Sequence, residues 1–255
     1  MKYLYKTPEE ELIDLSIRFR PLTLSPLAQV LHYLGVNYPD CWIGVRISSD
    51  FLKQYLPSKL PYKIPDDCKI PGDFDIIGGP LINKIPTDYV VSFEIKRFRY
   101  TASGDLKNPS DEFGRRKTIG YTLFGFNKVM LCHFVVAETV HHPDYNDWLL
   151  NAGIVGDGML AVKKKNIGIK QDTPCGYCIL GWSQVSHKDP LRAGSIPEPD
   201  IIKQAQNNPL ANDINFQQVR GALIERVRRV VGQKMEAQKN RVSQPIIIYS
   251  KDFED

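Results

Sequence analysis

The sequence predicts an α/β protein in which helices flank a mixed central β-sheet. Over residues 1–140 the residue patterns give the order helix, strand, strand, strand, helix, strand (αβββαβ). The last of these strands, Lys128–Glu138, is an almost continuous apolar run, which is typical of a strand buried on both faces. Residues 141–255 carry further helical and extended patterns. We interpret them as a C-terminal α/β extension that packs on the core within one continuous domain.

Capping residues mark the two helices at the start of the chain. Thr7 followed by Pro8 predicts a helix from Pro8 to about Phe19, because Thr7 can accept a hydrogen bond from the first turn. Ser25 can cap the start of a second predicted helix, and Gly35 marks its end.

Three strands and a helix follow in the predicted core. The strands cover residues 41–48, 73–77 and 89–98, and the helix begins near Ser110-Asp111 and runs towards Phe126. In the extension we expect a helix at 144–151, a turn at Gly156-Asp157-Gly158 and an exposed strand edge or loop at 159–169. A strand at 177–185 and a basic helix at 216–240 come next.

Composition excludes several classes of protein. The apolar and charged contents are ordinary for a globular chain, and a net charge of +4 does not by itself indicate nucleic acid. No signal peptide or membrane-spanning run is expected. Five cysteines without a secretory signal predict a reducing compartment, and we expect a cytoplasmic protein without a membrane partner.

The stretch from Pro71 to Tyr100 carries the chemistry. Side chains alternate between the two faces of a strand, so Asp73 and Asp75 share a face opposite Phe74 and Ile76. On the next strand Glu94 and Lys96 share a face, opposite Phe93 and Ile95. An antiparallel pairing of the two strands would bring the carboxylates together beside the Lys96 ammonium.

Converging carboxylates repel unless a cation lies between them. Mg²⁺ prefers oxygen ligands, and a neighbouring lysine can orient or deprotonate a water that the metal has acidified. Asp75, Glu94 and Lys96 are therefore the candidate catalytic residues, with Asp75 and Glu94 as metal ligands and Mn²⁺ as a substitute for Mg²⁺. Asp73 and the Ile95 carbonyl are accessory candidates. The alternative is a hairpin in which Glu94 forms a structural salt bridge, which leaves the acidic G-D-F-D strand unexplained.

Gly72-x-x-Asp75 on one strand and Glu94-x-Lys96 on the next resemble the signature of the PD-(D/E)XK nuclease superfamily, which has the restriction-endonuclease-like fold. The resemblance covers the element order of about 140 residues but only four residue identities. It implies that an acid of the first helix reaches the metal, for which Glu11 is the candidate and a solvated charge the alternative. Lys117 and Tyr121 resemble the Q-x-x-x-Y element of some of these nucleases, with Lys in place of Gln.

Basic residues accumulate after the Glu94-x-Lys96 strand. With Lys117 and Tyr121, the candidate nucleic-acid-binding residues are Arg97, Arg99, Arg115 and Arg116. Lysine and arginine contacts to phosphates give salt-dependent affinity and do not read sequence. A solvated helix face is the alternative for Arg115 and Arg116.

The sequence therefore predicts a Mg²⁺-dependent phosphodiesterase, an endonuclease that acts on DNA. The competing hypothesis is a nucleic-acid-binding or assembly module that has this fold without the chemistry. RNA as the substrate, exonuclease action and a homodimer all stay open. We find no glycine-rich phosphate loop or nucleophile elbow that would indicate a small-molecule enzyme.

Overall fold

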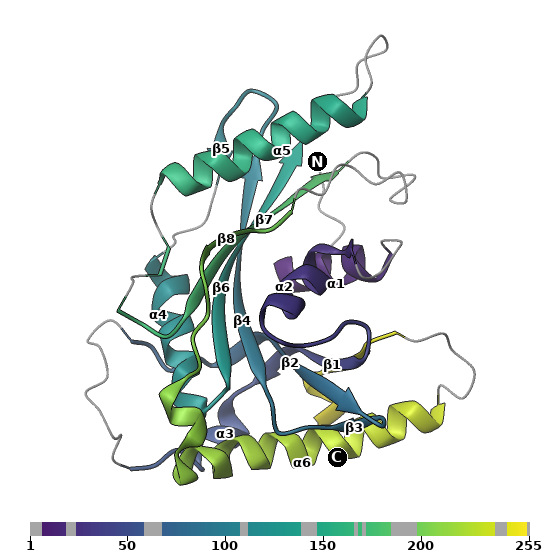
Figure 1. Cartoon of the computed structure of the whole chain (residues 1–255), viewed down its shortest axis with the longest axis vertical. Helices are drawn as coiled ribbons and strands as arrows, with labels where there is room; N and C mark the ends of the chain where they lie inside the picture. Colours follow the sequence, from purple (N-terminus) through teal and green to yellow (C-terminus); the bar gives the residue numbers. More distant parts are fainter. Residues whose placement is uncertain are drawn as a thin grey trace.

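A mixed sheet with helices on both faces forms the centre of the molecule, as expected from the sequence (Figure 1). The computed structural model describes residues 7–18, 24–58, 68–107, 112–138, 147–165, 168–169, 172–184, 198–237 and 244–253.

Nine strands of the described residues join in this sheet. Their bounds are β1 Cys41–Ser48, β2 Asp73–Ile82, β3 Ile85–Pro86, β4 Val91–Tyr100, β5 Leu106–Lys107, β6 Lys128–Glu138, β7 Gly176–Gln184, β8 Asp200–Lys203 and β9 Ile246–Tyr249. The order across the sheet is β8-β7-β6-β4-β2-β1-β9, while β3 pairs with β2 and β5 pairs with β4. The β4–β6, β6–β7 and β1–β9 pairs are parallel, and the β1–β2, β2–β4 and β7–β8 pairs are antiparallel. The two acidic strands therefore pair as we expected.

The α-helices of the described residues are α1 Pro8–Arg18, α2 Pro26–Tyr33, α3 Asp50–Lys53, α4 Glu112–Tyr121, α5 Asp147–Lys164 and α6 Ile214–Ala237. The predicted caps are confirmed: Thr7 Oγ1 accepts from the Glu10 amide at 3.3 Å, and Ser25 Oγ accepts from the Ala28 amide at 3.2 Å. A 3-10 turn at Thr122–Phe124 follows α4 and ends at Gly125, whose φ of +69° suits glycine. The expected start of α4 at Ser110-Asp111 lies outside the described residues.

Two hydrophobic clusters cover the two faces of the sheet. One contains Leu131 and Val135 of β6 together with residues of α4, α5 and α6. The other contains Met130 and Phe134 of the same strand together with residues of α1 and α2. This alternation along β6 confirms that it is a central strand buried on both faces. In Figure 1, α1 and α2 lie on one side of the sheet, and α4 lies on the other.

The C-terminal part of the chain adds strands to both edges of the sheet. β7 and β8 extend it beyond β6, and β9 pairs with β1 at the opposite edge. The long helix α6 runs along one end of the molecule (Figure 1), and its residues Val219, Leu223, Val227 and Val230 are buried as predicted. The last residues of the predicted 216–240 helix lie outside the described part of the chain.

One expectation in this part of the chain is wrong. Gly156-Asp157-Gly158 is not a turn, and residues 159–164 are not extended, because both segments belong to helix α5. Val155, Met159 and Val162 pack into the core at helical spacing, and this burial outweighs the low helix propensity of glycine.

No helix in the described part of the chain combines the length and the apolar character needed to cross a bilayer.

Candidate active site

The candidate site lies where β2 and β4 separate. Their ladder ends with the pair Ile76–Phe93, whereas β4 continues beside β6 to the pair Tyr100–Ala137. Beyond the end of the ladder, the Ile95 amide donates a hydrogen bond to Asp75 Oδ2 at 2.8 Å. The Asp75 carboxylate thus satisfies a backbone donor that a neighbouring strand would otherwise satisfy. This bond fixes the carboxylate of β2 against β4.

Asp73 and Asp75 both contact Lys117, as expected for one face, but the expectation that Phe74 and Ile76 share the opposite face is wrong. Phe74 belongs to the cluster on the α4 face, together with Ile77, whereas Ile76 belongs to the cluster on the α1 face. Opposite Asp75, between two paired positions of β1, Arg46 has a φ of +51°. A left-handed residue in a strand rotates the chain. This rotation explains why side chains two positions apart, which normally face the same side of the sheet, face opposite sides here. Such backbone strain costs on the order of 1–3 kcal/mol and is concentrated at functional sites.

One ammonium group joins the acidic side chains of the two strands. Lys117 Nζ lies 2.7 Å from Asp75 Oδ1, 3.1 Å from Glu94 Oε2 and 3.1 Å from Asp73 Oδ1. The Glu94 side chain is fully buried, and those of Asp75 and Lys117 are almost so, at 7% and 11% exposure. Asp75 and Glu94 therefore face a common cation, as the sequence predicts, but in this structure the cation is a lysine. We call Asp73, Asp75, Glu94 and Lys117 the carboxylate cluster.

Tyr121 completes the inner side of the carboxylate cluster. Its hydroxyl accepts a hydrogen bond from the Asp75 amide at 2.9 Å and donates one to Glu94 Oε2 at 2.7 Å. Residues four apart on a helix share a face, so α4 presents Tyr121 and Lys117 together to the strands. The Tyr121 ring packs edge-on against Phe74, at 5.2 Å between centroids, and holds α4 against β2.

Lys96 lies on the more open side of the same cluster. Its Nζ is 2.6 Å from Glu94 Oε1, and its side chain keeps 19% of its exposure. Although this ion pair is short, Glu94 Oε1 is buried and receives no well-directed hydrogen bond. The aliphatic stem of Lys96 passes Gly114 of α4, where a β-carbon would approach Lys96 Cε to 2.8 Å. The absence of a side chain at Gly114 therefore makes room for Lys96.

Burial and charge determine the protonation of the cluster. Burial, followed by the nearby Asp75 charge, raises the pKa of Glu94 to about 8, although Lys96 and Lys117 act in the opposite direction. Burial alone would lower the pKa of Lys117, but the Asp75 and Glu94 charges outweigh it and raise that pKa above its usual value. Lys117 therefore keeps its charge, and Glu94 binds a proton more readily than an ordinary glutamate does.

The first helix carries two buried acids, Glu9 and Glu11, in different environments. Glu11, the predicted ligand, accepts a hydrogen bond from Arg97 Nη1 at 2.7 Å. Glu9 is instead the buried acid whose pKa is raised by burial and then by the charge of Asp75. Glu9 precedes the buried residues Leu12 and Ile13 by three and four positions, a spacing that could have indicated its inward direction.

The predicted nucleic-acid-binding residues lie in different environments. Arg97 pairs with Glu11, and Arg99 pairs with Glu138. On α4, Arg115 is half-buried and Arg116 is exposed. Lys117 and Tyr121 lie inside the carboxylate cluster, so they contact carboxylates and do not form a phosphate-facing surface.

No protein-family model, curated protein or solved structure matches this chain. The site therefore has to be interpreted from its own geometry.

Within the described residues, no group of three or more His, Cys, Asp and Glu side chains is arranged to hold a metal ion. The donor chemistry nevertheless suits a hard cation, because oxygens of Asp73, Asp75 and Glu94 already surround the Lys117 ammonium. The buried Glu94 Oε1, which lacks a directed partner, provides a further acceptor. The residues fit a divalent cation in kind and charge, with Lys117 as the group that neutralises them in this structure.

Proposed function

We propose that this protein is a metal-dependent nuclease that hydrolyses phosphodiester bonds of DNA. The observation that carries the proposal is the convergence of Asp75 and Glu94 on one cation, with Lys96 Nζ 2.6 Å from Glu94. Asp75, Glu94 and Lys117 have no need to be buried together for packing alone, since burying charge costs free energy. A site that binds a metal cation and a phosphate anion would explain why these charged side chains lie together.

The fold supports the same proposal. We assign α1, β1, β2, β4, α4 and β6 to the restriction-endonuclease-like core, because their order along the chain is that of the PD-(D/E)XK nucleases. The chain adds β7 and β8 at one edge of this core and β9 at the other.

Asp75 and Glu94 would hold a Mg²⁺ or Mn²⁺ ion, with Asp73 and the Ile95 carbonyl as accessory ligands. When bound, the ion supplies Lewis-acid stabilisation of the charge that develops on the phosphoryl oxygens. The Ile95 amide bond orients Asp75, and the Tyr121 hydroxyl orients Glu94, so both carboxylates are held in place before any ligand binds.

In this proposal Lys96 acts on the attacking water. Its side chain is less buried than that of Lys117, so it can face substrate and solvent while Glu94 fixes its position. It would hold the water in line with the phosphorus and stabilise the negative charge that develops on the water oxygen as its proton leaves to solvent. Exposed basic residues beside the site, of which Arg116 is the clearest, would contact the phosphate backbone.

The test is an incubation of purified protein with circular and linear DNA in Mg²⁺ or Mn²⁺. We expect cleavage that is abolished by a chelator and by Lys96→Ala, while DNA binding by Lys96→Ala stays within a few-fold of wild type. Lys53→Ala, which removes an exposed lysine paired with Asp50, is the matched control and should cleave normally. Cleavage by Lys96→Ala at the wild-type rate would refute the role given to Lys96.

One observation favours a second candidate, a DNA-binding module without catalysis. Lys117 already neutralises Asp73, Asp75 and Glu94, so the cluster is satisfied without a metal ion. Salt-dependent DNA binding without cleavage in either metal would favour this candidate over the nuclease.

A further inference from the structure

A hollow of about 590 Å³ opens beside the carboxylate cluster and shares Asp73 with it. Its lining includes Val45 and Arg46 of β1, Glu10 of α1, and Tyr249 and Lys251 at the end of the chain. Its volume lies within the range of small-ligand sites. The nuclease proposal described above gives this hollow no role.

The C-terminal segment that forms one wall of the hollow is fixed at several points. Ser250 Oγ accepts a hydrogen bond from the Ser48 amide at 3.0 Å and donates one to the Arg46 carbonyl at 2.6 Å. Asp252 Oδ2 accepts from the Tyr249 amide at 2.7 Å and pairs with Lys234 of α6 at the same distance. Tyr249 and Lys251 are therefore held beside the strained Arg46 backbone.

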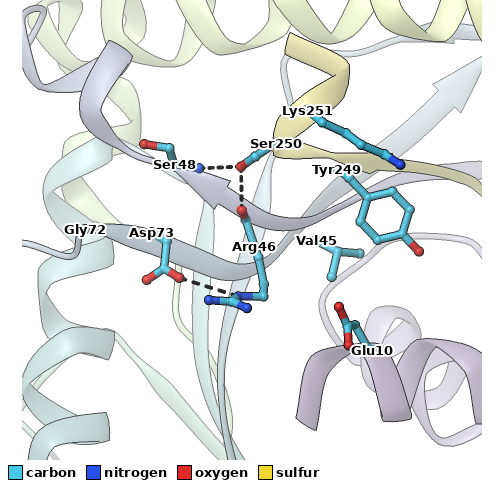
Figure 2. Close-up of a pocket in the computed structure, with 9 residues that line it drawn as sticks. All are labelled: Glu10, Val45, Arg46, Ser48, Gly72, Asp73, Tyr249, Ser250 and Lys251. Atoms are coloured by element: carbon cyan, nitrogen blue, oxygen red, sulfur yellow. Dashed lines mark hydrogen bonds and ion pairs between the residues drawn. The ribbon is translucent and has the colours of Figure 1, made fainter. Parts of the chain in front are cut away.

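The lining separates into two chemical halves, which Figure 2 shows. On one side the Arg46 guanidinium, half exposed, points towards Asp73, with 3.9 Å between Arg46 Nε and Asp73 Oδ2. On the other side lie Val45, the Tyr249 ring and the Glu10 carboxylate. One half offers a cation next to the carboxylate cluster, and the other offers the exposed Tyr249 ring with Lys251 beside it.

We propose that this hollow binds the DNA nucleotide next to the bond that is cut. Arg46 contacts its phosphate, and its base stacks on Tyr249, beside the Lys251 ammonium that lies 5.9 Å from the centroid of that ring. Aromatic stacking and a cationic groove are the two means by which proteins hold single-stranded nucleic acid. This inference rests on the proposed nuclease function, because it assigns the hollow to the strand that passes over the carboxylate cluster.

Charge in the hollow sets the direction in which the nucleotide lies. At the Tyr249 end the Glu10 carboxylate offsets the charge of the Lys251 ammonium, and this carboxylate can accept hydrogen bonds from the amino group of a base. The phosphate is thereby directed to Arg46, the end that shares Asp73 with the cluster. A lone inorganic anion would leave the Tyr249 and Val45 half unused.

The experiment measures binding of the full-length chain to a short fluorescein-labelled single-stranded oligodeoxynucleotide, with EDTA present so that nothing is cut. We expect Tyr249→Ala to weaken binding about tenfold or more, while Tyr249→Phe, which keeps the ring, binds as the wild type does. Arg46→Ala should weaken binding and lower the slope of log Kd against log salt by about one. Tyr33→Ala, at 42% exposure against 38% for Tyr249, and Lys163→Ala are matched controls away from the hollow.

Wild-type affinity of both Tyr249→Ala and Arg46→Ala, or a loss equal to that of the controls, overturns the inference. Thermal melting of Tyr249→Phe and Tyr249→Ala separates a loss of the ring from a loss of folding. The two proposals fail in different ways. If the protein binds DNA through Tyr249 but does not cut it in Mg²⁺ or Mn²⁺, only the nuclease proposal fails. If it cuts DNA and Tyr249→Ala binds normally, only the hollow has been misassigned.

Discussion

Lys117 Nζ lies 2.7 Å from Asp75 Oδ1, and this contact connects the helix α4 to the strand β2 through the centre of the carboxylate cluster. The same ammonium is 3.1 Å from Glu94 Oε2 on the neighbouring strand β4. A single side chain therefore offsets the repulsion between acids that come from two strands. A divalent cation held by the same oxygens would take over that role, so the charge on Lys117 and a bound metal should substitute for each other.

Replacing Lys117 with methionine tests this relationship. Lys117→Met keeps the length of the side chain but leaves buried carboxylates without their cation, which should lower the free energy of unfolding by about 3–5 kcal/mol. Urea unfolding in EDTA measures the loss. Mg²⁺ should then raise the melting temperature of Lys117→Met by more than it raises that of the wild type.

Lys163→Met is the matched control for that substitution. Lys163 pairs with Asp200 at 2.9 Å, but both side chains are well exposed, so the loss should stay below about 1 kcal/mol. Wild-type stability of Lys117→Met, or the absence of any extra effect of Mg²⁺, would contradict the assignment of Lys117 as a substitute for the metal.

The raised pKa of Glu94 predicts the direction in which stability depends on pH. Because burial and Asp75 raise that pKa from 4.5 to about 8, the folded protein retains a proton that the unfolded chain releases. The stabilisation is complete below about pH 4.5 and is lost as the pH rises through 8. Metal-free wild-type protein should therefore become less stable between these values, with a slope of at most about 1.4 kcal/mol per pH unit from this one group.

Glu94→Gln removes the titrating group while keeping the shape of the side chain. Equilibrium unfolding in EDTA across this pH range should give a flatter dependence for Glu94→Gln than for the wild type. Glu225→Gln, at an exposed position of α6, controls for the change in net charge. Parallel curves for the wild type and Glu94→Gln would show that Glu94 is not the group that titrates.

Much of the site could be predicted because its residues lie on regular elements. The alternation in β4 places Glu94 and Lys96 on one face, and the four-residue spacing in α4 brings Lys117 and Tyr121 to the same side. The antiparallel pairing of β2 with β4 then brings Asp75 to Glu94. These periodicities are local properties of the backbone, so the sequence is sufficient to infer them.

The rest depends on tertiary contacts that no local pattern records. The positive φ of Arg46 reverses the inward positions of β1 and β2, and a single sequence gives no sign of it. In the sequence Lys117 looks like a surface lysine within a basic run. Only the packing of α4 against the acidic strands places it in the carboxylate cluster. The glycines of α5 suggest a turn because propensity disfavours helix there, but packing of Val155 and Met159 determines the outcome.

The acid that α1 contributes to the site can be identified by paired substitutions. Glu9 is buried and interacts electrostatically with Asp75, so we expect Glu9→Gln to reduce the cleavage rate about 10–100-fold, as loss of a supporting group near a metal does. Glu11→Gln weakens the ion pair with Arg97 and should instead lower the free energy of unfolding by about 1–3 kcal/mol, with cleavage near the wild-type rate. The reverse pattern would restore Glu11 as the ligand. Cleavage assays and urea unfolding on both variants distinguish the two results.

Gly114 offers a way to separate activity from stability. A methyl group at this position would approach Lys96 Cε to 2.8 Å and Lys96 Cγ to 2.9 Å, so Gly114→Ala should displace the lysine from Glu94. Alanine also favours a helix over glycine by about 1 kcal/mol, which should offset the cost of moving the flexible Lys96 chain. We therefore expect Gly114→Ala to keep or raise the melting temperature while lowering the cleavage rate at least tenfold.

Gly156→Ala in α5 is the matched control, because a β-carbon there meets no atom within 4 Å. It should raise the free energy of unfolding by about 1 kcal/mol and leave cleavage unchanged. DNA binding by Gly114→Ala in EDTA should remain close to that of the wild type, since the substitution moves Lys96 without removing its charge. Full cleavage activity in Gly114→Ala would mean that the position of Lys96 beside Glu94 does not limit the reaction, and the role proposed for this lysine would then have to be abandoned.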